Sequence, residues 1–205
     1  MLAERRATAT RSHVGHLPDL TKAVLREAGF ELADVDAVAV SIGPGSFTGL
    51  RIGVAFAKGL AYAGRIALIG VSTLEAHAHC ARRDGASAAI CVANDARKGE
   101  VYAALFDTTA SGVERRWPDA AYRPDALLRR LPAGALVVGD AVAILTECAT
   151  TAGGSIRTAD IVPSGAVVGC LGAAALARGE EAGVGELEPS YVREPDATLP
   201  ATPLR

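Results

Sequence analysis

The stretch Gly43-Pro44-Gly45-Ser46-Phe47-Thr48-Gly49-Leu50-Arg51 decides how this chain folds. It follows residues 35–42, a short run of apolar and β-branched residues that is typical of a buried strand. The glycines favour a sharp turn, and Ser46 stands where the N-cap of a helix is expected. The stretch therefore predicts a strand that turns directly into a helix, as in α/β folds.

The helix expected over residues 46–63 carries only two charges, Arg51 and Lys58, which lie on one face because they are seven positions apart. A helix that is apolar nearly all round needs cover on more than one side. Small residues recur along it and form a low ridge: Gly49, Gly53, Ala57 and Ala61. The ridge would allow close contact with another protein, and it would equally allow close packing on the chain's own sheet. The sequence pattern does not decide between these two interpretations.

Strand-like and helical segments alternate in both halves of the sequence, which predicts an α/β architecture. Strands are expected over residues 2–10, 66–71, 88–92, 101–106 and 135–138, and helices over residues 17–28, 72–83, 123–131, 141–151 and 166–178. The polar residues 94–99 are expected to join two strands as a hairpin. We expect two domains, residues 1–85 and 86–205, with the last helix packing back on the first domain.

The composition excludes several classes of protein. A net charge of −2 gives no broad cationic surface for a nucleic-acid backbone. No apolar run approaches the ~18 residues that a membrane span needs, so we expect a cytoplasmic protein without a membrane contact. The four cysteines form no CxxC pair and fit buried thiols in a reducing compartment: Cys80, Cys91, Cys148 and Cys170.

The glycine turn is also a candidate anion site, because the first turn of a helix presents free N–H groups and a positive dipole end. Gly43, Gly45 and Ser46, together with Asp95, are the candidate contacts for a phosphate, a carboxylate or a nucleotide. No lysine follows Gly49 as a P-loop requires, and the glycine spacing is not that of the dinucleotide-binding fingerprint. A purely structural turn with a serine cap explains the stretch equally well.

Catalytic and metal-binding patterns are weak elsewhere. There is no HExxH or GxSxG motif, and the histidines fit surface or capping roles. Asp95, Asp107 and Asp140 are candidate acids or magnesium ligands, although turn and cap roles explain them as well. We therefore assign no catalytic residue and no metal site.

Several motifs together carry a resemblance to a known family. They are the glycine stretch continued to Gly53, Ala57-Lys58-Gly59-Leu60-Ala61, Gly70-Val71-Ser72-Thr73-Leu74-Glu75-Ala76, Asp95-Ala96-Arg97-Lys98-Gly99-Glu100-Val101-Tyr102 and Pro189-Ser190-Tyr191-Val192-Arg193. With these motifs the sequence closely resembles the TsaB family, also called YeaZ, over almost its whole length.

The resemblance implies an actin-like fold of two domains (ASKHA or ribonuclease H-like) without a working ATPase site. It implies a non-catalytic subunit that pairs with the catalytic subunit TsaD and the ATPase TsaE in the threonylcarbamoyladenosine (t6A) modification of tRNA. It further implies a homodimer when the chain is alone, only indirect contact with tRNA, and no intrinsic cofactor, with ATP or ADP at the junction of the complex. The implied pairing surface comprises Leu17, Leu20, Val24, Gly49, Ile52, Gly53, Phe56, Ala57 and Leu60.

One departure from the family concerns the start of the chain. Family members begin with a strand that carries an Ile-Asp-Thr-Ser signature, followed by a second strand, and both precede the positions that match residues 1–6. Neither strand is present in this sequence. We therefore expect a first domain without its first two strands, which leaves the edge of the strand at residues 35–42 unpaired. A misplaced start codon or a truncated chain accounts for this.

Two other functions stay open from the sequence. The first is a nucleotide-using enzyme of the actin-like superfamily, with the glycine turn and the Asp95 turn as phosphate contacts. The second is a peptidase, an activity attributed to the wider family, for which the sequence offers no recognisable nucleophile or metal set.

Overall fold

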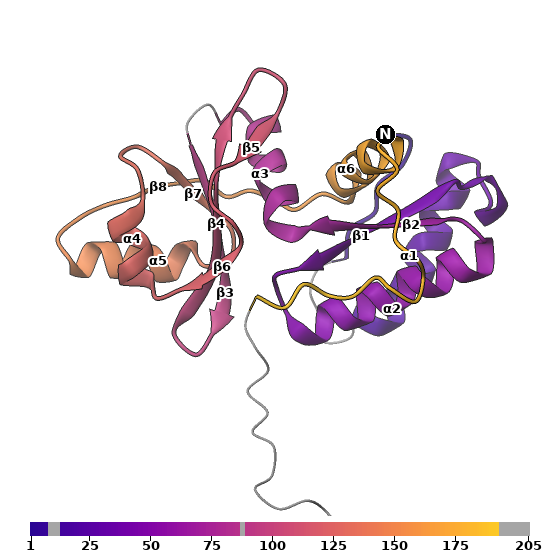
Figure 1. The fold of residues 1–205 in the computed structure, drawn as a ribbon, viewed down its shortest axis with the longest axis horizontal. Coiled ribbons are helices and arrows are strands. Elements are labelled where there is room, and N and C mark those ends of the chain that lie inside the picture. The colour runs from indigo at the N-terminus through magenta and orange to yellow at the C-terminus, as the bar shows by residue number, and fades with distance from the viewer. Residues whose placement is uncertain (8–12, 87–88, 193–205) are drawn as a thin grey trace, which may run out of the picture.

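The computed structural model describes residues 1–7, 13–86 and 89–192 of the chain, which form two halves around two separate sheets (Figure 1). The first sheet consists of β1 (Ala37–Gly43) and β2 (Ala67–Ser72), which are parallel and in register from Ala37 opposite Ala67. Helix α2 (Phe47–Gly64) connects these two strands. The α/β class expected from the sequence is confirmed.

Serine caps begin the two helices that follow these strands. The Gly49 amide donates to Ser46 Oγ at 3.4 Å at the start of α2. The Glu75 amide donates to Ser72 Oγ at 3.3 Å at the start of α3 (Thr73–Arg83). The cap at Ser46 was predicted, and each cap satisfies one of the amides that lack an intrahelical acceptor.

Three helices accompany the first sheet. Helix α2 contributes Val54, Ala57 and Ala61 to one core, and α6 (Gly165–Ala177) packs on β1 and β2 in another. Helix α1 (His13–Ala28) lies beside α2 (Figure 1), and none of its residues from 16 to 28 is fully buried. A short 3₁₀ turn, η1 (Leu32–Asp34), leads from α1 toward β1.

The strand expected at residues 2–10 is wrong for residues 2–7, and residues 8–10 lie outside the described parts. Residues 1–7 have no regular structure and lie near the start of α6 (Figure 1). Ser164 Oγ donates to Glu4 Oε1 at 2.8 Å, which lowers the pKa of Glu4. Side-chain contact with the first turn of α6 thus replaces strand pairing. Within the described residues β1 pairs with β2 alone.

The second sheet has the strand order β5-β4-β3-β7-β8, and β6 also pairs with β4. The strands are β3 (Ile90–Arg97), β4 (Glu100–Thr108), β5 (Val113–Arg115), β6 (Ala120–Tyr122), β7 (Leu136–Val138) and β8 (Arg157–Thr158). The hairpin of β3 and β4 is confirmed, but its turn is shorter than expected. Only Lys98 and Gly99 connect the two strands, and both residues have positive φ (55° and 77°). A two-residue hairpin turn that matches the twist of the strands requires such positive φ values.

Helices cover both faces of the second sheet. Alternate residues of β3 face opposite sides, so Cys91 and Ala93 pack under α4 (Pro124–Arg130) and α5 (Val142–Thr151). Ile90 and Val92 face α3. Helix α3 precedes residue 85 and nevertheless shares a core with the second sheet, while its first turn adjoins the first sheet.

The cysteines are all free thiols, but not all are buried as expected. Cys80 and Cys91 are buried, whereas Cys170 is exposed on α6. Burial raises the pKa of Cys91 to about 12. No helix in the described parts of the chain is long and apolar enough to span a membrane.

The end of the described chain returns across the first half. Residues 182–192, the C-terminal strap, begin with a bridge between Ala182 and Leu68 of β2. Leu187 then enters the core beneath α2. The Ser190 amide finally donates to the Ile42 carbonyl oxygen at 2.7 Å, so the strap ends at the glycine turn.

The contact between α6 and β1 yields a stability test. A methyl group at Gly172 would collide with Cβ of Ala39, so Gly172→Ala should lower the free energy of unfolding by about 1–3 kcal/mol in chemical denaturation. The control is Gly169→Ala on the same helix, where an added methyl meets nothing within 4 Å and alanine favours the helix. Equal effects of the two changes would contradict the packing described here.

Candidate functional site: the cleft at the glycine turn and the adjoining helical face

A cleft of about 910 Å³ opens beyond the carboxyl ends of β1 and β2. Ligands of open α/β sheets bind at this edge, where strands pass into helix starts. Its walls come from the glycine turn, the first turns of α2 and α3, the end of β3, Tyr102 of β4, Asp140 after β7, and the strap. The lining includes Pro44, Gly45, Ser46, Phe47, Thr48, Thr73, His77, Asn94, Asp95, Arg97, Tyr102, Asp140 and Tyr191.

The glycine turn is fixed from two sides. The Gly43 amide donates to Thr73 Oγ1 of α3 at 3.1 Å, and the strap holds the neighbouring Ile42 carbonyl. Gly43 has φ +117°, and a Cβ there would lie 2.9 Å from the Ser190 carbonyl oxygen. Only glycine fits this position, because both the backbone angle and the strap exclude a side chain.

The opposite wall contains two of the three aspartates singled out from the sequence, Asp95 and Asp140. The Asp95 amide donates to Asp140 Oδ1 at 2.6 Å, and the Asp140 amide donates to Asn94 Oδ1 at 3.4 Å. Asp95 also accepts from the Arg97 amide at 2.7 Å and pairs with the Arg97 guanidinium at 3.1 Å. Asp107 lies elsewhere, 3.6 Å from the Arg116 guanidinium. Among the described residues there is no cluster of three or more metal-binding side chains.

His77 lies in the cleft and is not a surface or capping histidine as expected. The residue is only 8% exposed, and its Nδ1 atom is buried and has no hydrogen-bond partner among the described residues. Burial lowers the pKa of His77, although the charge of Asp140 acts in the opposite direction. His77 stands one helical turn after Thr73, so helix periodicity applied to α3 could have found it.

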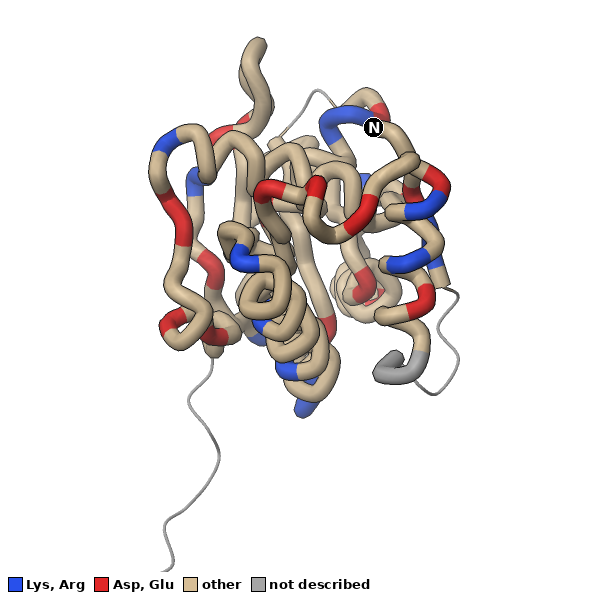
Figure 2. Tube along the Cα trace, turned by 90° about the vertical axis from the view of Figure 1, so that its right-hand side faces the viewer, with Lys and Arg blue, Asp and Glu red and all other residues tan. Residues whose placement is uncertain are grey.

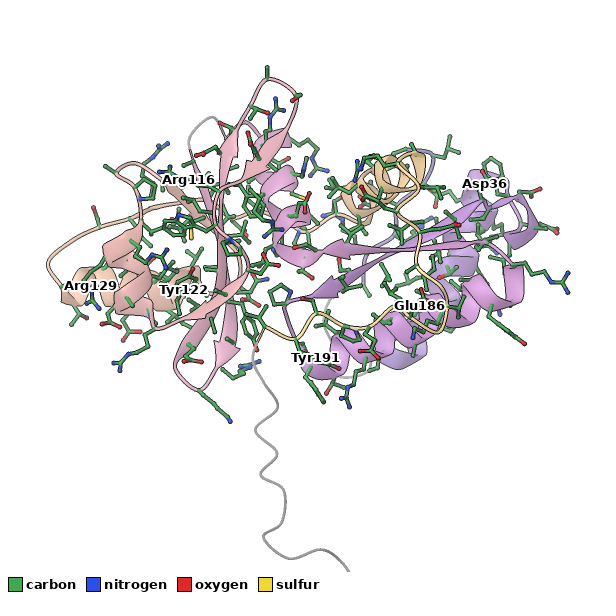
Figure 3. The ribbon with its side chains drawn as sticks, viewed as in Figure 1. Asp36, Arg116, Tyr122, Arg129, Glu186 and Tyr191 are labelled. Atoms are coloured by element: carbon green, nitrogen blue, oxygen red, sulfur yellow. The ribbon has the colours of Figure 1, made fainter. Side chains whose placement is uncertain are left out.

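Arg51, Phe47 and Tyr191 form an aromatic clasp at the rim of the cleft, which the sequence did not predict. The Arg51 guanidinium carbon lies 3.8 Å from the centre of the Phe47 ring, and Arg51 Nε donates to Tyr191 Oη at 3.0 Å. The rings of Phe47 and Tyr191 are 5.7 Å apart. Tyr191 reaches the first turn of α2 at the end of the strap (Figure 3). No sequence signal joins Arg51 to a residue 140 positions away.

The ridge of small residues on α2 faces inward. Ala57 and Ala61 are 3% and 1% exposed, and a Cβ at Gly53 would lie 3.8 Å from Val40 of β1. Packing on the chain's own sheet, one of the two alternatives left open, therefore accounts for the ridge. A large residue at Gly53 would press on β1.

The outward side of α2 carries different residues. Ala55, Gly59 and Tyr62 are exposed, with Tyr62 at 78%, and a Cβ at Gly59 would meet nothing within 4 Å. The other members of the expected pairing surface are half-buried: Leu17, Leu20, Val24, Gly49, Ile52, Phe56 and Leu60. On this side of the molecule Lys, Arg, Asp and Glu are interspersed, without an extended region of one sign (Figure 2).

Comparisons with known sequences agree on one group of proteins. Residues 7–143 match the family model TsaD, tRNA N6-adenosine threonylcarbamoyltransferase. The chain is 30% identical to the tRNA threonylcarbamoyladenosine biosynthesis protein TsaB of Escherichia coli over 89% of this chain and 81% of that protein. It is 46% identical to the tRNA N6-adenosine threonylcarbamoyltransferase of Ehrlichia ruminantium, but over only 34% of this chain and 20% of that enzyme.

Solved structures give the same answer. YeaZ from Pseudomonas aeruginosa superposes with a TM-score of 0.75 at 26% identity, over 89% of this chain and 86% of that one. A crystal structure described as an uncharacterized protein with similarity to peptidase YEAZ, from the same organism, gives a TM-score of 0.75 at 28% identity, over 89% and 85%. The chain therefore belongs to the TsaB (YeaZ) family, within the wider group that the threonylcarbamoyltransferase model describes.

Proposed function

We propose that this chain is a non-catalytic subunit of the machinery that makes threonylcarbamoyladenosine in tRNA, and that it pairs with the catalytic subunit TsaD through the face of α1 and α2. In this proposal the two sheets are the two domains of an actin-like fold, and TsaE joins the pair. The chain acts by association and contacts tRNA only through its partner.

The incomplete burial of the α1 and α2 face carries the proposal. Helix α1 keeps Leu17, Leu20 and Val24 half-buried, and no residue from 16 to 28 is covered completely. The outward side of α2 adds Ala55, Gly59 and Tyr62, where small residues permit close approach and an exposed tyrosine can anchor a partner. A stable pair of proteins buries about 1,600 Å² in total, which two adjacent helices can supply.

A nucleotide-using enzyme is the second candidate, because the cleft contains a helix start and two carboxylates. We favour the subunit for two reasons. The match to the transferase extends over 20% of that enzyme, so its activity does not carry over to this chain. Asp95 and Asp140 are also engaged with backbone amides and Arg97. Turnover of ATP by the isolated chain would favour the enzyme instead.

The pairing surface can be tested with a charge on the outward side of α2. Ala55→Glu should weaken binding to TsaD from the same organism at least tenfold, about 1.4 kcal/mol, because a carboxylate would be buried in the contact. Titration calorimetry measures this effect. Chemical denaturation should show a stability change within about 0.5 kcal/mol, since Ala55 is exposed.

The matched control is Ala143→Glu, an exposed alanine on α5 in the other half of the molecule. It should leave the affinity for TsaD unchanged. Equal affinities of both variants and the unmodified chain would remove α2 from the interface. If the proposed homodimer uses the same face, Ala55→Glu should also shift the isolated chain toward monomer in analytical ultracentrifugation.

The subunit role itself is tested by omission. A reconstituted reaction with TsaD, TsaE, tRNA, ATP and the threonylcarbamoyl donor system should lose most of its product when this chain is left out. Adding the chain back should restore it, and adding Ala55→Glu should restore it only at higher concentration, because the defect lies in association. Full modification without the chain would contradict the proposal.

A further inference from the structure

We propose that Arg115, with Ser72, Glu75 and Asp119, forms an electrostatic latch that holds the two halves of the molecule at one angle and so sets the width of the cleft. Arg115 is the last residue of β5 in the second sheet, and its guanidinium reaches Ser72, the last residue of β2 in the first sheet. The proposal does not depend on the proposed function, since it concerns the isolated chain.

The chain passes between the two halves at two places. The first is the step from β2 into α3 at Ser72 and Thr73, and the second is the segment 159–164 between β8 and α6. Helix α3 lies between the two sheets (Figure 1). Ser72 is therefore a point about which one half can turn relative to the other.

The apolar contacts of α3 are uneven on its two sides. Leu74, Ala78 and Ala81 pack in the core against the second sheet. Ala76 is the buried residue that α3 contributes to the core of the first sheet. An alanine side chain buries little apolar area, so polar contacts have a large share in fixing the angle between the halves.

Arg115 contacts three side chains that meet at the start of α3. Its Nη1 donates to Asp119 Oδ1, and its Nη2 donates to Ser72 Oγ at 3.1 Å and to Glu75 Oε2 at 3.3 Å. The guanidinium carbon lies 4.7 Å from the centre of the Phe106 ring of β4. Asp119 precedes β6, so residues of three segments in the second half position the guanidinium that binds the end of the first sheet.

The Ser72 hydroxyl uses its full hydrogen-bonding capacity in this latch. It accepts from the Glu75 amide at 3.3 Å and from Arg115 Nη2 at 3.1 Å, and it donates to Asp119 Oδ2 at 3.2 Å. A turn of the halves about Ser72 would break its bonds to both residues of the second half together. The side chains of Arg115 and Asp119 are 29% and 17% exposed, so salt screens their ion pair less than a pair at the surface.

The latch lies on the side of α3 that faces away from the cleft. Thr73 and His77 line the cleft, whereas Glu75 is on the other side of the helix, because two positions along an α-helix correspond to about 200°. Neither Arg115 nor Asp119 lines the cleft. The glycine turn on one wall belongs to the first half, and the end of β3 on the opposite wall belongs to the second. The angle held by the latch therefore sets the distance between the walls.

The test measures this angle through a distance in the full chain. Nitroxide labels are attached to the exposed Cys170 of α6 and to Ala143→Cys, an exposed position on α5, in a parent chain that carries Cys148→Ala. Cys80 and Cys91 stay unlabelled, because they are buried and burial raises the pKa of both thiols. Pulsed double electron–electron resonance then gives the distribution of the distance between α5 and α6.

Arg115→Met removes the charge but keeps a long, unbranched side chain beside Phe106. We expect the distance distribution to shift or broaden by more than about 2 Å, which is the scale of a hinge movement rather than of local adjustment. The matched control is Arg116→Met, since Arg116 is exposed and pairs with Asp107 within the second half. The control should keep the distribution of the parent chain.

An unchanged distribution in an Arg115→Met chain that is folded by circular dichroism would overturn the proposal, and so would an equal change in Arg116→Met. If Arg115→Met does not fold, Asp119→Asn decides, because it removes the charge that Arg115 contacts and keeps the shape of the side chain. Its control is Asp125→Asn, which changes a carboxylate of α4 in the second half. A change in Asp119→Asn alone supports the latch, and equal distributions of these two variants contradict it.

Discussion

The hydrogen bonds that hold the glycine turn are the constraint on which the rest of the structure depends. The Gly43 amide is bound by Thr73 of α3, and the Ile42 carbonyl is bound by Ser190 of the strap. Three segments that are far apart in the sequence therefore meet at one turn. This meeting fixes the direction of α2, sets the position of the cleft, and brings Tyr191 to Arg51.

Local chemistry explains what could be predicted from the sequence. A β-branched run, a glycine turn and a serine cap specify β1 and α2 without any distant contact, and the Ser72 cap specifies α3 in the same way. The strands β5, β6 and β8 are two or three residues long, too short for any periodicity to reveal. The clasp and the strap contacts were also out of reach, because they join residues more than a hundred positions apart.

The two sides of α2 show why an all-round apolar helix was hard to interpret. Small residues at Gly53, Ala57 and Ala61 looked suited to a partner, yet they bring α2 close to its own strands. The outward side is also apolar, at Ala55 and Gly59, and nothing in the described chain covers it. Periodicity identifies faces but does not say which face meets the sheet. Only the position of β1 beneath Gly53 decides that.

The proposed partner face and one wall of the cleft are two parts of one helix. Its first turn lines the cleft, and its outward side adjoins α1. Arg51 belongs to the cleft, where it stacks on Phe47, which is exposed at the rim. Because one helix carries both, a change at the glycine turn that displaced α2 would move the proposed partner face together with the clasp of Arg51, Phe47 and Tyr191.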